Sequence, residues 1–126
     1  MSLELIDSYQ EKIENANQRS ERTRYATELY SKLSVKELDD EAITLAASLI
    51  GNNLSEYIAD RIIEDYKIWR KLVLVEEGRL DPSDIRTVLN TGIERKIFTS
   101  SEVMDAEISY NKKNGRDKQT VLVHRP

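Results

Sequence analysis

Apolar residues recur along much of this chain at spacings of three and four, which is the spacing of one face of an α-helix. The longest series consists of Ile58, Ile62, Tyr66, Trp69 and Val73. Asn53 before it is a suitable helix cap, and Gly78 after it is a suitable helix end. We therefore expect a long central helix at about 54–77, with the large side chain of Trp69 in the core.

A second series precedes this helix and consists of Val35, Leu38, Ala42, Leu45 and Leu49. Ser34 and Glu37 match a capping box, in which each of the two side chains accepts a hydrogen bond from a backbone amide of the first turn. Gly51 provides the kind of residue that adopts the left-handed conformation at helix ends. The pattern predicts a helix at 35–50.

A short helix is expected after the central one. Asp81 and Pro82 form a start signal, because proline at the first helical position loses no amide that the helix needs. The inner face of this helix consists of Ile85, Val88 and Leu89. Gly92 follows them and is the expected end of the helix.

The N-terminal region carries two apolar stripes at helical spacing. The first consists of Leu3, Ile6, Ile13 and Ala16, and the second of Tyr25, Leu29 and Leu33. Residues 17–24 between them include no apolar side chain. This polar stretch is either an exposed turn of one long helix or a break between two helices.

The C-terminal region supports two interpretations. Thr99 and Glu102 match a capping box for a helix that would extend to Gly115. Apolar and polar residues nevertheless alternate strictly over 104–111, and this alternation is typical of a strand. Periodicity alone leaves both interpretations open.

A β-hairpin at about 103–124 is the favoured interpretation of this region. Asn114 and Gly115 form a preferred hairpin turn, and residues 119–123 beyond it are rich in β-branched side chains. A lone strand there would need a partner from another chain, because an unpaired strand edge is adhesive. A helix at 100–113 would leave dimerisation through that strand as one way to pair it.

These elements and the composition predict a mainly α fold. With 33% charged and 39% hydrophobic residues, the chain has the narrow apolar stripes of a helical bundle. Its four glycines and two prolines are too few for a many-stranded all-β fold. We expect one domain over residues 1–126, a compact bundle of four to five helices around the central helix, with a basic C-terminal segment at 112–126.

The chain also lacks membrane signals. No stretch approaches the roughly 20 apolar residues that span a bilayer. The N-terminus interrupts its apolar residues with acids, so it has neither the basic start nor the apolar run of a signal peptide. We therefore expect a soluble, cytoplasmic protein without a membrane partner.

Candidate catalytic and metal-binding groups are few. The chain has no cysteine, and its single histidine, His124, lies close to the C-terminal end without a second ligand at metal spacing. The four glycines are isolated, so no phosphate-binding loop is formed. Glu56, Asp60 and Glu64 share a helix face that would suit a hard cation, but a bundle usually draws such ligands from several helices. We interpret this face as solvated and expect no enzymatic activity, metal or cofactor.

Charge is distributed unevenly along the chain. Residues 112–126 carry five basic residues and one acid, which leaves 14 basic and 22 acidic residues in the first 111. The basic residues of this segment are Lys112, Lys113, Arg116, Lys118 and Arg125. On a hairpin the first four of these would gather at the tip and present positive charge to a phosphate backbone, as the wing of a winged helix does. Arg19, Arg22 and Arg24 form a second, weaker cluster, which we interpret as a solvated helix surface.

The first apolar stripe is thin for a core helix. Its residues, Leu3, Ile6, Ile13 and Ala16, lie on an otherwise polar segment, so this seam would suit a partner protein or a second copy of the chain. The main hypothesis is a non-enzymatic adaptor, inhibitor or assembly subunit that acts through helix-mediated protein contacts and forms a homo-oligomer. The alternative is a nucleic-acid-binding regulator that uses the basic C-terminal hairpin.

Overall fold

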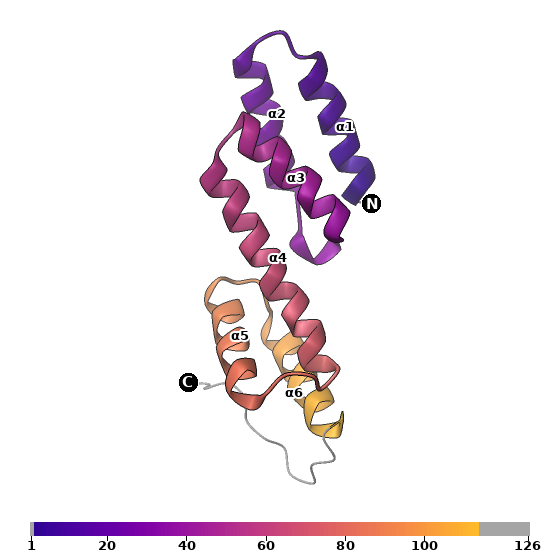
Figure 1. Cartoon of the computed structure of the whole chain (residues 1–126), viewed down its shortest axis with the longest axis vertical. Coiled ribbons are helices and arrows are strands. Elements are labelled where there is room, and N and C mark those ends of the chain that lie inside the picture. The colour runs from indigo at the N-terminus through magenta and orange to yellow at the C-terminus, as the bar shows by residue number, and fades with distance from the viewer. Residues whose placement is uncertain (1, 114–126) are drawn as a thin grey trace. The chain divides into compact units, whose positions relative to one another are not determined.

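The computed structural model describes residues 2–113, and this part of the chain is helical without strands (Figure 1). The helices are α1 (Ser2–Asn15), α2 (Arg19–Lys32), the 3₁₀ turn η1 (Val35–Glu37), α3 (Asp40–Asn53), α4 (Glu56–Glu76), α5 (Pro82–Glu94) and α6 (Ser100–Lys113). The predicted mainly α fold is confirmed. The described residues contain six α-helices and not the predicted four to five, because a break separates α1 from α2 and because α6 forms where the first arm of the hairpin was expected.

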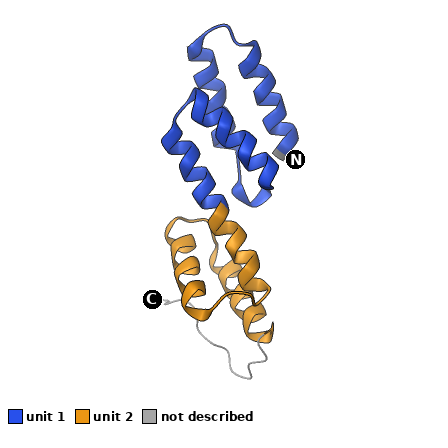
Figure 2. Ribbon diagram, in the orientation of Figure 1, with its two compact units in different colours: residues 1–66 blue, residues 67–126 orange. Residues whose placement is uncertain are grey.

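The chain divides into two compact units, unit 1 with residues 1–66 and unit 2 with residues 67–126 (Figure 2). The boundary falls inside α4, so this helix contributes residues to both units. The expectation of one domain for the whole chain stays a prediction.

Unit 1 is built from α1, α2, α3 and the first part of α4 around one apolar core. The buried residues of this core are Ile6, Tyr9, Leu29, Leu38, Ala42, Ile43, Ala46, Ala47, Ile50, Ala59, Ile62 and Tyr66. A third of them are alanines, and all four alanines lie on α3 and α4. Small side chains at these positions let the two helices approach closely, as the neighbouring Gly51 and Ala59 show.

The start of α3 differs from the prediction. Ser34 makes no capping hydrogen bond, and only one 3₁₀ turn follows it. The helix begins at Asp40, where the carboxylate of Asp39 accepts a hydrogen bond from the amide of Ala42 at 2.8 Å. Aspartate caps a helix as well as serine does, and the acids that follow it favour the positive end of the helix dipole. Starting the helix later also leaves Leu38 in extended backbone, with its side chain buried in the core.

The central helix α4 begins and ends within two residues of the prediction. Its cap is Ser55, whose hydroxyl accepts from the amide of Ile58 at 3.3 Å, while the expected cap Asn53 donates to the carbonyl of Leu49. At the other end Gly78 has φ of 72°, as expected for a helix stop. The amides of Gly78 and Arg79 donate to carbonyls of the last turn, which completes a Schellman motif.

The apolar stripe predicted for α4 is only partly buried. Ile62 and Tyr66 belong to the core of unit 1, whereas in unit 2 the buried residues of this helix are Leu72 and Val75. Trp69 is half-buried and lies against Phe98, with ring centres 6.0 Å apart and planes tilted by 52°. Different residues of α4 are therefore buried in the two units.

Unit 2 combines the end of α4 with α5 and α6. The start of α5 at Pro82 is confirmed, but the expected stop at Gly92 is wrong, because the helix continues to Glu94. Gly92 is buried under the ring of Phe98, and a Cβ atom there would lie 2.2 Å from two ring carbons. This glycine makes room for an aromatic side chain and does not end the helix.

The helical interpretation of the C-terminal region holds over the described residues. Thr99 and Glu102 form the predicted capping box, with hydrogen bonds of 2.8 and 3.1 Å between each side chain and the other residue's amide. The strand expected at 103–111 is wrong, because this segment belongs to α6. Residues 114–124, the remainder of the predicted hairpin, lie outside the described residues.

Candidate functional site

The predicted N-terminal seam is divided by the fold. Ile6 and Ile13 are 0% and 5% exposed within unit 1, together with Tyr9, which lies between them on the same face of α1. Leu3 stays partly exposed and Ala16 is half-buried. Two of the four seam residues therefore serve the core of their own unit, because α1 packs against α2 and α3. Of the four seam residues, only Leu3 and Ala16 at its two ends remain accessible to a partner.

Tyr9 is surrounded by charged side chains of α1 and α2. Its hydroxyl donates to the carboxylate of Glu28 at 3.3 Å. The ammonium groups of Lys12 and Lys32 lie 4.6 and 5.3 Å from the centre of its ring. Its hydrogen bond to Lys32 raises the pKa of that lysine, and the negative charge of Glu28 adds to this. These contacts join α1 to α2.

The acids that could have formed a metal site do not converge. Glu56, Asp60 and Glu64 are exposed along α4, and the described residues contain no group of three potential ligands that could hold a metal ion. A looser acidic surface lies in unit 2 around Glu76. Partial burial raises the pKa of Glu76, and the charges of Asp105, Glu102 and Glu77 raise it further.

The basic segment is described only at its beginning. Lys112 and Lys113 are exposed in the last turn of α6, where positive charge favours the negative end of the helix dipole. Arg116, Lys118 and Arg125 lie outside the described residues. The wing-like arrangement at 103–124 cannot form as predicted, because its first arm is helical.

One exposed apolar surface was not predicted from the sequence. Met104 and Ile108 are 46% and 50% exposed, and they lie one turn apart on α6. The opposite side of this helix is buried through Val103, Ala106 and Tyr110. We call Met104 and Ile108 the outer face of α6. The alternation of apolar and polar residues over 104–111 contained a signal for this surface. If the segment is a helix, residues two positions apart point in different directions, so some of the alternating apolar side chains must lie outside the buried face.

The other large apolar side chains on the surface are isolated or polar at one end. Ile93 of α5 is partly exposed in unit 2. In unit 1, Tyr57 is 74% exposed and Tyr30 is also exposed, but each carries a hydroxyl that water can solvate. Single exposed residues of this kind are normal on protein surfaces. The outer face of α6 is therefore the most distinctive apolar feature of the described surface.

The described helices and the comparisons with known proteins add two findings. Among residues 2–113, none of the helices combines the length and apolar character needed to cross a membrane. No family model, curated protein or solved structure with which the chain was compared matches it.

Proposed function

We propose that this chain is a non-enzymatic cytoplasmic binding protein, an adaptor, inhibitor or assembly subunit, which contacts another protein or a second copy of itself through α6. The observation that carries the proposal is the outer face of α6, where two large apolar side chains lie exposed one turn apart. Amphipathic helices commonly bind a partner through apolar residues at this spacing.

The surroundings of this face support its use in binding. Asp105 and Lys112 are exposed on the same helix, so charged groups border the apolar pair. An apolar centre with a charged rim is the usual composition of a protein interface. Methionine adds flexibility, which lets it fit partner surfaces of irregular shape.

Light scattering of the purified full chain over a concentration series tests self-association. We expect a concentration-dependent increase in mass that is lost when Met104 and Ile108 are both replaced by serine. Tyr57→Ser is the matched control, because it removes a more exposed side chain from another helix. This control variant should behave as the unmodified chain does.

A photoreactive residue at position 108 tests binding to a different protein. It should form a discrete crosslinked product in cells, whereas the same group at position 57 should not. A chain that remains monomeric at high concentration, with equal or absent crosslinking at the two positions, would contradict the proposal.

The alternative function is nucleic-acid binding by the basic segment, which the exposed Lys112 and Lys113 at the end of α6 favour. Phosphate contacts weaken steeply as salt rises. Binding of mixed double-stranded DNA should therefore fall along a salt series and vanish for a chain that ends at Asn111. Absence of binding by both forms would remove this alternative.

A further inference from the structure

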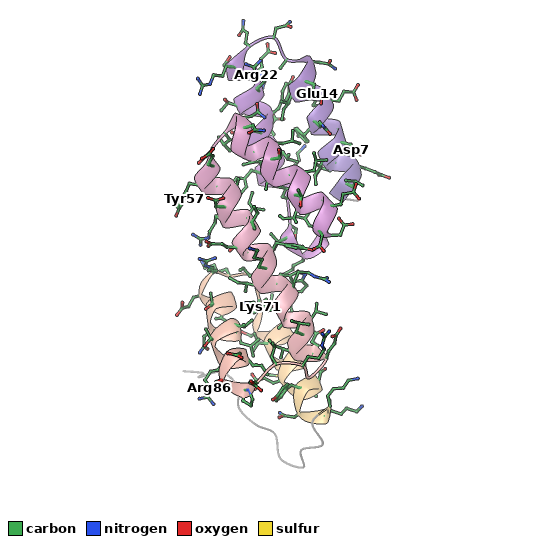
Figure 3. All side chains as sticks on the ribbon, viewed as in Figure 1. Asp7, Glu14, Arg22, Tyr57, Lys71 and Arg86 are labelled. Atoms are coloured by element: carbon green, nitrogen blue, oxygen red, sulfur yellow. The ribbon has the colours of Figure 1, made fainter. Side chains whose placement is uncertain are left out.

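Unit 1 has a polar hollow where the beginning of α2 meets the junction between α3 and α4. Its volume is about 330 Å³, which is near the lower end of the range for small-ligand sites. The polar side chains that line it are Arg19, Arg22, Thr23, Asn52, Asn53 and Ser55, with Glu56 also contributing. Figure 3 shows Arg22 near the start of α2, at the end of unit 1 where α3 finishes.

The two arginines of this hollow have no acidic partner among the described residues, although unit 1 is rich in acids. Residues 1–66 include 14 acidic and seven basic side chains. Arg22 donates to the backbone carbonyl of Ala16 at 3.4 Å, and no carboxylate lies within ion-pair distance of it or of Arg19 in the described part of the chain. The spacing of three residues places both on one side of α2.

The remaining polar groups differ in their capacity to bind a ligand. The hydroxyl of Ser55 already caps α4, and the amide of Asn53 is bound to the carbonyl of Leu49. The amide of Asn52 has a contact of 3.5 Å with Ser48, at the upper limit for a hydrogen bond. Together with the Thr23 hydroxyl, Asn52 can therefore assist the two guanidinium groups as a donor.

The other charges in the hollow do not favour an anion. The carboxylate of Glu56 repels anions, and the negative end of α3 at Asn53 offsets the positive end of α4 at Glu56. The preference for an anion is therefore carried by Arg19 and Arg22. Two guanidinium groups present planar pairs of donors, a geometry that matches the several oxygens of a phosphate group.

We propose that this hollow binds a phosphate group, with the guanidinium groups of Arg19 and Arg22 donating to its oxygens and with Thr23 and Asn52 as additional donors. The group belongs either to free phosphate or to a phosphorylated side chain of another protein. The inference is independent of the outer face of α6, because it involves residues of unit 1 alone.

Titration of the ¹⁵N-labelled full chain with inorganic phosphate, at constant ionic strength, tests the proposal. Backbone amide shifts should change and saturate at residues 19–23 and 51–56. Arg19→Gln should weaken binding by about tenfold, the typical effect of losing a charge-assisted hydrogen bond. The phosphate affinity of Arg19→Lys should lie between those of the unmodified chain and Arg19→Gln, because lysine keeps the positive charge but lacks the paired donors of arginine.

Two further variants sharpen the test. Arg24→Gln is the matched control, since Arg24 lies over the ring of Tyr25 at 5.0 Å and does not line the hollow. It removes the same charge and should leave phosphate binding unchanged. Glu56→Gln should strengthen binding several-fold, because it removes the opposing carboxylate. A gain of affinity cannot result from loss of folding.

Arg19 is exposed, so its variants should melt at the temperature of the unmodified chain. A phosphoserine peptide compared with free phosphate distinguishes the two sources, the tighter ligand identifying which one the hollow accepts. Shifts that do not saturate, equal shifts with chloride, or undiminished binding by Arg19→Gln would overturn the proposal.

Discussion

The two units each contain a glycine within a helix, and the two glycines meet different surroundings. In unit 1 a Cβ atom at Gly51 would lie 3.4 Å from the Cβ of Ala59, an ordinary contact distance. In unit 2 a Cβ atom at Gly92 would overlap the ring of Phe98. A glycine in a helical pattern can therefore mark the close approach of another element, as the ring of Phe98 does at Gly92. Gly78, with its positive φ, ends a helix.

Substitution of Gly92 should have the largest effect. Gly92→Ala forces the buried ring of Phe98 to move, and overpacking of this kind costs about 1–3 kcal/mol of unfolding free energy. Urea unfolding followed by the fluorescence of Trp69, the single tryptophan of the chain, reports on unit 2 directly.

A second variant tests whether the ring causes this loss. Gly92→Ala combined with Phe98→Leu should be less destabilised than the sum of the two single substitutions, because the smaller side chain leaves space for the new methyl group. Strictly additive effects would show that the overlap at Gly92 is not the cause.

Helix caps provide the next comparison, between a capping box that forms and one that does not. Thr99→Ala should reduce the unfolding free energy by about 1 kcal/mol, because it removes an observed capping bond. Ser34→Ala should change it by less than about 0.5 kcal/mol, since Ser34 makes no such bond. Urea unfolding measured by circular dichroism compares the two variants. Equal losses would contradict the assignment of the caps.

The fold was predictable where a signal acts locally. Pro82 and the Thr99 capping box identified two helix starts, and Gly78 identified one helix end. Ser34 and Asp39 are competing local signals, and burial of Leu38 together with the acids after Asp39 favours the later start. Burial of Leu38 depends on the packing of other helices, so a rule based on neighbouring residues in the sequence cannot predict it.

The candidate surfaces were less predictable for the same reason. Ile6 and Ile13 formed a seam in the sequence, but other helices cover them in the fold. The outer face of α6 was not predicted, because the alternation over 104–111 favours a strand. The polar hollow joins residues about 30 positions apart, Arg19 and Arg22 with 51–56, and no spacing rule connects them.

Gly51 should respond in the opposite direction to Gly92. Gly51→Ala lies inside α3 and makes only an ordinary contact, so it should raise the unfolding free energy by about 0.5–1 kcal/mol through the better helix propensity of alanine. Urea unfolding followed by circular dichroism measures this gain in unfolding free energy. A loss of stability at Gly51 would remove the distinction between the two glycines.

The smallest expected difference between the units is electrostatic. In unit 1 the pKa of Lys32 is raised, so its contribution to stability is complete below the ordinary lysine value of 10.5 and is lost as pH rises through the raised pKa. In unit 2 the pKa of Glu76 is raised above its ordinary value of 4.5, so its protonated form is favoured by folding. The contribution of Lys32 to stability therefore changes in the alkaline range, and that of Glu76 changes in the acidic range.

Glu76→Gln tests the contribution in unit 2. The ionised carboxylate opposes folding at neutral pH, because partial burial disfavours its charge and Asp105, Glu102 and Glu77 repel it, so the variant should be more stable at pH 7. The gain should be below about 0.5 kcal/mol, since Glu76 is largely exposed and solvent screens these charges. It should shrink as pH falls through the raised pKa and vanish below 4.5, where the carboxyl is protonated in both states. Asp84→Asn is the matched control, because Asp84 is exposed in the first turn of α5, where its charge favours the positive end of the helix dipole, so its loss should give no gain. Identical pH profiles for the two variants would show that the acidic surroundings of Glu76 do not affect stability.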